Sequence, residues 1–128
     1  MIFADSSFFI GLADKRDSWH KRALKVKSRL RDELVISDLI ISESVTMIGY
    51  RAGGEAGKTL YNFFRDNCKV EFVSEDILDE AMNLFSKFDG KLSVADSASV
   101  IIMKRKKIKG ILSFDSDFDR IKGIDRIY

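Results

Sequence analysis

The 128-residue sequence has little sulfur and little histidine: it contains a single cysteine and a single histidine. Because Cys68 has no second cysteine to pair with, a disulfide within the chain and a cysteine-based zinc site are both excluded. No apolar run reaches the roughly 18 residues of a membrane span. The first residues, Met1 to Asp5, lack the basic start and long apolar run of a signal peptide. These absences predict a protein of the reducing cytoplasm.

Several sequence motifs of nucleotide-binding proteins and hydrolases are missing as well. The sequence has no GxxxxGK[ST] phosphate-binding loop and no GxGxxG dinucleotide-binding loop. It offers no Ser-His-Asp arrangement for nucleophilic catalysis. The only histidine, His20, lies in a basic segment, where we expect it to be structural or at the surface.

The composition is that of an ordinary globular protein, with 45% hydrophobic and 33% charged residues. The length predicts one domain over residues 1–128. The net charge of +2 conceals basic patches, because residues 15–31 contain eight basic residues and one acid, and residues 104–109 contain five basic residues. Lys21, Lys25 and Arg29 share one face of a predicted helix, which suits either a phosphate-binding stripe or a merely solvated surface.

Short apolar segments alternate with helical patterns along the chain. Strands are expected at 2–4, 34–36, 70–73 and 110–114, with a terminal edge strand at 125–127. Helices are expected at 8–13, 17–31, 39–52, 55–67, 74–88 and from 92 onward. The last helix is apolar on almost every side, which predicts that it lies in the core. The pattern predicts an α/β fold with three α/β/α layers around a short, mainly parallel sheet.

Acidic residues are expected to gather at one edge of this sheet. Asp5 follows the first strand and Asp115 follows a later one, and the carboxyl ends of parallel strands share the edge where ligands bind. Asp96 lies in the first turn of the buried helix. Glu43 lies on the apolar stripe of a mid-chain helix, an unexpected place for an acid unless that stripe borders a polar cleft.

Each of these acids also has a purely structural interpretation. Asp5 suits a strand end or a helix cap, and Ser93 with Asp96 matches the capping box of a helix start. Glu43 could reach solvent at the rim of the sheet. The weight shifts toward a functional site because separate acids project toward one place on this fold.

Three alternating acids follow the strand at 110–114, and a solvated loop would explain them equally well. We favour Asp115 as the member of the site because it directly ends the strand. Asp117 is a reserve candidate, and Asp119 is assigned to the loop.

Converging carboxylates repel one another unless one is protonated or a cation neutralises them. Oxygen ligands favour Mg²⁺ or Mn²⁺ over zinc. Such ions bind phosphate oxygens, lower the pKa of bound water and stabilise displacement at phosphorus. Basic patches beside the acids would hold a polyanionic substrate.

In order and spacing, these residues resemble the PIN-domain ribonucleases. The resemblance is carried by Asp5-Ser6-Ser7, by Glu43, by Leu92-Ser93-x-x-Asp96-Ser97 and by Ser113-Phe114-Asp115-x-Asp117-Phe118. The small size and the segment Asp17-x-Trp19-His20-x-x-Ala23 resemble the VapC-type toxins in particular. The sequence departs from the family in Ser97, where alanine commonly follows the aspartate.

The resemblance implies a metal-dependent endoribonuclease in which Asp5, Glu43, Asp96 and Asp115 are the catalytic and metal-binding residues. Asp5 and Asp96 would be the primary ligands of one or two Mg²⁺ or Mn²⁺ ions, and Ser6 and Ser113 match polar positions beside the acids. The resemblance further implies a cytoplasmic toxin, often a homodimer, with an RNA substrate and a cognate antitoxin.

Three alternatives stay open at this stage. The chain could be an RNA-processing or structure-specific nuclease without an antitoxin, or a non-catalytic RNA-binding or protein-interaction module. The second of these gives no reason for a repulsive acidic cluster. A phosphotransfer receiver fits less well, because it requires a lysine at a strand end where this sequence has an acid.

Overall fold

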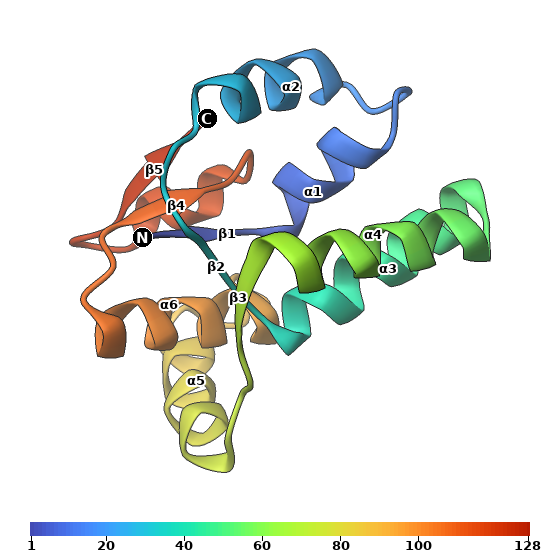
Figure 1. Ribbon diagram of the computed structural model, residues 1–128. Helices are drawn as coiled ribbons and strands as arrows, with labels where there is room; N and C mark the ends of the chain where they lie inside the picture. The colour runs from blue at the N-terminus through green and yellow to red at the C-terminus, as the bar shows by residue number, and fades with distance from the viewer.

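The computed structural model describes residues 1–128, and its centre is a five-stranded sheet in the order β3-β2-β1-β4-β5 (Figure 1). Every pairing between neighbouring strands is parallel. The strands are β1 (Ile2–Ala4), β2 (Leu34–Ser37), β3 (Cys68–Glu71), β4 (Gly110–Leu112) and β5 (Asp125–Ile127). From β1 the chain builds outward to β3 on one side and later returns to add β4 on the other. The strand order therefore reverses between β1 and β4, where open α/β sheets place their ligands.

Helices cover both faces of the sheet, as Figure 1 shows with α1 and α2 on one side and α5 and α6 on the other. Helix α1 packs on α2 and α3, α3 packs on α4, and α5 packs on α6. The helices are α1 (Ser6–Ala13), α2 (His20–Arg29), α3 (Asp38–Ala52), α4 (Gly54–Asn67), α5 (Glu75–Lys87), α6 (Val94–Lys106) and the 3₁₀ helix η1 (Ser116–Arg120). The prediction of a three-layer α/β/α fold is confirmed.

Helix α6 is the central element of the core. Its residues from Asp96 to Met103 are all buried, as its apolar sequence predicts. Its first turn is capped by Ser93, whose hydroxyl accepts a hydrogen bond from the Asp96 N–H at 3.0 Å. The Ser93 backbone N–H donates no hydrogen bond to the Asp96 carboxylate, so only half of the predicted capping box forms. A side-chain hydrogen bond with Ser93 lowers the pKa of Asp96, against the larger raising effect of burial.

Several predicted boundaries are wrong. Strand β4 ends at Leu112 and not at residue 114, because its pairing with β1 ends there, so Asp115 lies three residues beyond the strand and does not directly end it. Helix α1 begins at Ser6 and not at residue 8. The third strand runs from Cys68 to Glu71 and not over 70–73, because its pairing with β2 starts at Leu34 opposite Cys68. Helix α2 begins at His20 and not at Asp17. Asp17 instead closes the turn before the helix, since its carboxylate accepts the Trp19 N–H at 2.9 Å and pairs with Arg51 of α3 at 2.9 Å.

None of the helices is both long and apolar enough to cross a membrane.

Candidate active site

Asp5 lies at the carboxyl end of β1, where it caps α1. Its Oδ2 atom accepts hydrogen bonds from the hydroxyls of Ser7 and Ser113, both at 2.8 Å. Its Oδ1 atom is buried and has no hydrogen-bond partner in the protein. The side chain is 2% exposed, and burial is the largest cause that raises the pKa of Asp5. A buried carboxylate oxygen without a partner is costly, and it requires an explanation.

Ser113 joins the ends of β1 and β4. Its hydroxyl donates to Asp5 and accepts the N–H of Asp115 at 3.0 Å. Ser7 makes a parallel link, because its hydroxyl accepts the Phe114 N–H at 2.9 Å and lies 3.2 Å from the Ser113 hydroxyl. These contacts hold the chain after β4 against the end of β1, and Asp115 is therefore held beside Asp5 at one edge of the sheet, as the sequence predicts.

Asp115 also begins the next helix. Its Oδ1 atom accepts the Asp117 N–H at 2.9 Å and so caps η1. The carboxylate of Asp117 lies 3.6 Å from the Arg120 side chain, and that of Asp119 lies 2.9 Å from Arg126. Of the three acids after β4, Asp115 is the one whose charge acts on the buried Asp96, as shown by its effect on the pKa of Asp96.

Glu43 reaches the same edge from α3. The Ser6 hydroxyl, at the start of α1, donates a hydrogen bond to its Oε1 atom. Glu43 itself is exposed, and its charge raises the pKa of both Asp5 and Asp96. The apolar stripe of α3 thus borders a polar edge at Glu43, which accounts for an acid on that stripe.

The pKa of Asp96 is raised by burial and by the charges of the other three acids. Burial raises its pKa most, and the charges of Asp5, Asp115 and Glu43 raise it further, to about 7. The other three acids named by the sequence therefore lie within electrostatic reach of Asp96. As the side chains stand, no group of three acids is close enough to enclose a metal ion.

The donors at this edge fit a hard divalent cation. All four candidate side chains offer carboxylate oxygens, the ligands that Mg²⁺ and Mn²⁺ prefer. The Oδ1 atom of Asp5 is buried and unpaired, and the pKa of Asp96 is raised. A nearby positive charge would stabilise the ionised form of both carboxyl groups. Their roles as metal ligands stay a prediction.

Two residues of this edge were not predicted. Ser7 bridges Asp5 and the chain after β4, and only its position two residues after Asp5 hints at this bridge. Arg126 of β5 donates to the Ser113 carbonyl at 3.3 Å, and its pKa is raised mainly by Asp119 with a smaller contribution from Asp115. No local sequence signal identifies Arg126, because its place depends on the pairing of β5 with β4. His20 is structural, as expected: its ring Nδ1 lies 2.8 Å from the Gly11 carbonyl oxygen.

Comparison with known proteins decides the family, because a PIN domain family model matches residues 2–124. The chain belongs to the PIN-domain family. Among curated proteins, this PIN domain is 27% identical over 120 residues to the 23S rRNA-specific endonuclease VapC20 of Mycobacterium tuberculosis, covering 92% of each chain.

Solved structures support the same fold. The crystal structure of Mycobacterium tuberculosis VapC20, a sarcin-ricin loop cleaving toxin, superposes with a TM-score of 0.90 at 24% identity, covering 97% of each chain. A toxin-antitoxin complex from Klebsiella pneumoniae matches with a TM-score of 0.73 at 15% identity, over 98% of this chain and 96% of that one. The structure of VapBC2 from Rickettsia felis bound to a promoter DNA fragment matches with a TM-score of 0.70 at 12% identity, over 99% of this chain and 98% of that one. The predicted resemblance to PIN domains of the VapC type is confirmed.

Proposed function

We propose that this PIN domain is a divalent-metal-dependent endoribonuclease and the toxin of a toxin–antitoxin pair. The observation that carries the proposal is the convergence of Asp5, Glu43, Asp96 and Asp115 at the strand-order reversal, with one buried carboxylate oxygen unpaired. The relationship to VapC20, an endonuclease specific for 23S rRNA, supports RNA as the substrate.

In the proposed mechanism, Asp5 and Asp96 would hold one or two Mg²⁺ or Mn²⁺ ions, and Glu43 and Asp115 would complete the ligand set. A bound ion would supply Lewis-acid stabilisation of the phosphoryl oxygens and a water of lowered pKa. Ser113 and Ser7 fix Asp5 Oδ2 with two hydrogen bonds, so that Oδ1 stays available. Ser6 orients the Glu43 carboxylate in the same way. Glu43, the more exposed acid, would orient the attacking water.

The toxin assignment draws on the relatives. The similar structures from Klebsiella pneumoniae and Rickettsia felis are toxin–antitoxin assemblies, one of them bound to promoter DNA. We therefore propose a cognate antitoxin as a partner and a homodimer as the working form, in the cytoplasm. Exposed apolar residues of α5, Leu78 and Met82, are available for such contacts.

The activity is tested by incubating the purified protein with ribosomal RNA in Mg²⁺, in Mn²⁺ and in EDTA. Cleavage that requires the divalent ion supports the proposal, and equal cleavage in EDTA contradicts it. The biological role is tested by inducing the chain in a bacterial host. Growth arrest that a small neighbouring gene product relieves supports a toxin, whereas unaffected growth with an active enzyme favours an RNA-processing nuclease.

A further inference from the structure

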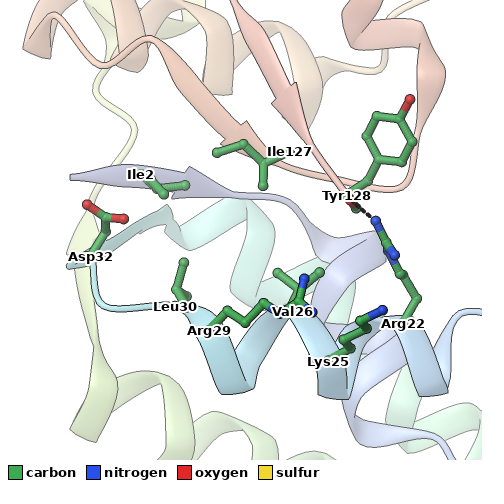
Figure 2. A pocket seen from close by; sticks show the side chains of 9 residues that line it. All are labelled: Ile2, Arg22, Lys25, Val26, Arg29, Leu30, Asp32, Ile127 and Tyr128. Carbon is green, nitrogen blue, oxygen red and sulfur yellow. Dashed lines mark hydrogen bonds between the residues drawn. The ribbon is translucent and has the colours of Figure 1, made fainter.

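A groove lies between α2 and the part of the sheet that includes Ile2 of β1 and Ile127 of β5 (Figure 2). Arg22, Lys25 and Arg29 of α2 line one wall, and the apolar side chains of Ile2, Val26 and Ile127 lie deeper. The cavity volume is about 320 Å³, which is within the usual range of ligand sites in proteins. The groove is thus an apolar cleft with a basic wall.

The basic wall is not neutralised by neighbouring acids. Lys25 and Arg29 are exposed and make no ion pair within the chain, and Asp32 is the single acid that lines the groove. Arg22 donates to the main-chain oxygen of Tyr128 at 2.7 Å, which orients the guanidinium. Uncompensated cations along a groove attract a polyanion. Lys21, which the sequence grouped with Lys25 and Arg29, does not line the groove.

The groove connects to the acidic edge through a chain of contacts. Tyr128, which holds Arg22, also lies under the Arg126 guanidinium, with 3.8 Å between the guanidinium carbon and the ring centroid. Arg126 in turn donates to the carbonyl of Ser113, the residue that positions Asp5 and Asp115. The Arg22 side of the groove is therefore joined, through Tyr128 and Arg126, to the segment that positions Asp5 and Asp115.

Trp19 packs against the segment that follows β4. Its ring stacks on Phe114, with centroids 4.6 Å apart and an angle of 3° between the planes. Phe114 lies between Ser113 and Asp115 in the chain, and Trp19 precedes Arg22 by one helical turn. Trp19 is nevertheless 41% exposed, although it is a large aromatic residue. An exposed indole held rigidly beside cations is a stacking surface for a nucleobase.

We propose that this groove binds single-stranded RNA adjacent to the scissile phosphate, with Lys25 and Arg29 pairing with phosphates and Trp19 stacking on a base. The proposal rests on the proposed function, because it assigns a path for the same substrate. An acidic protein segment would satisfy the cations of α2. It would give no reason for an exposed indole stacked on Phe114, and RNA is therefore the better match.

The test measures RNA binding in EDTA, so that binding is separated from cleavage. A labelled single-stranded RNA of about 12 nucleotides, within the usual site sizes of such proteins, is titrated against the wild-type protein by fluorescence anisotropy. The double variant Lys25→Gln/Arg29→Gln removes two proposed phosphate contacts. The variant Lys21→Gln is the matched control, since it removes a charge from the same helix outside the groove.

We expect the double variant to bind about tenfold or more weakly and to lower the slope of log affinity against log salt by about 1.4. Lys21→Gln should stay within about twofold of the wild type. Because Trp19 is the only tryptophan, its intrinsic fluorescence reports stacking directly, and RNA should quench it. Trp19→Ala should weaken binding about tenfold, and Trp19→Phe should restore most of the loss.

The proposal is overturned if the double variant binds RNA as the wild type does, or if RNA binds without quenching Trp19. It is also overturned if poly-glutamate binds as tightly as RNA, because the groove would then belong to an acidic protein segment. If RNA binds in the groove but the protein does not cleave RNA in Mg²⁺ or Mn²⁺, the proposed endonuclease activity is refuted and the proposal of an RNA-binding groove stands. If the wild type cleaves RNA and the variants bind RNA as tightly as the wild type, only the proposal of RNA binding in the groove is refuted.

Discussion

Replacing Asp96 by asparagine should stabilise the metal-free protein at neutral and alkaline pH. The pKa of Asp96 is raised from its ordinary value of 3.8 to about 7, first by burial and then by the charges of neighbouring acids. The folded state therefore holds this proton more tightly than the unfolded state does. The carboxyl stabilises the fold below about pH 4, and this contribution is lost as the pH rises to about 7. Asparagine resembles the protonated acid in shape and does not ionise.

The size of the effect follows from the two pKa values. At 1.36 kcal/mol per pKa unit, ionising Asp96 in the folded protein costs up to about 4 kcal/mol. The free energy of unfolding of Asp96→Asn should thus match the wild type near pH 4 and exceed it by up to about 4 kcal/mol at pH 8. For a domain of this length the melting temperature should rise by more than about 10 °C.

The measurement is thermal and urea unfolding in EDTA from pH 4 to pH 8. Asp119→Asn is the control, because Arg126 lowers the pKa of the exposed Asp119 and its neutralisation should give no gain at pH 8. If the difference between Asp96→Asn and the wild type does not grow with pH, the electrostatic account of the acidic edge is wrong.

Two further predictions concern the same edge. Mn²⁺ at about 100 times its dissociation constant should stabilise the wild type by about 2.7 kcal/mol and should stabilise Asp5→Asn much less. The melting temperature of the wild type should therefore be higher in Mn²⁺ than in EDTA, and equal melting temperatures would count against a metal site. Ser113→Ala should lower the free energy of unfolding by about 1–3 kcal/mol and reduce RNA cleavage, because Asp5 Oδ2 and the Asp115 N–H each lose a hydrogen-bond partner. Chemical denaturation and initial cleavage rates measure these effects, and unchanged values would show that the Ser113 hydroxyl does not position the acids.

Much of the fold is readable from the sequence because its elements carry strong local signals. The apolar residues on almost every side of α6 predict a buried helix, and the cap at Ser93 lies where the sequence predicts it. The boundary of β3 was wrong because only pairing with β2 decides where that strand begins. The alternation of apolar and polar residues within one strand does not determine its register against the neighbouring strand.

Some residues of the site could be predicted from the sequence and others could not. Topology brings the four predicted acids to one edge, since strand ends and helix starts have known places in a parallel α/β fold. Ser7 and Arg126 could not be predicted, because their hydrogen bonds join segments more than ten residues apart in the sequence. The basic stripe was assigned to Lys21, Lys25 and Arg29, whereas the groove is lined by Arg22 in place of Lys21. Helical spacing gives faces of a helix, and only packing shows which face borders a cleft.

The most direct test of the account compares RNA cleavage by the wild type, Asp5→Asn and Asp96→Asn in Mg²⁺ and Mn²⁺. Loss of a metal ligand removes several kcal/mol of transition-state stabilisation, so each variant should cleave about 10³-fold more slowly or not at all. Circular dichroism and melting curves should show both variants folded. Metal-dependent cleavage at the wild-type rate in either folded variant would contradict the assignment of this acidic edge as the active site.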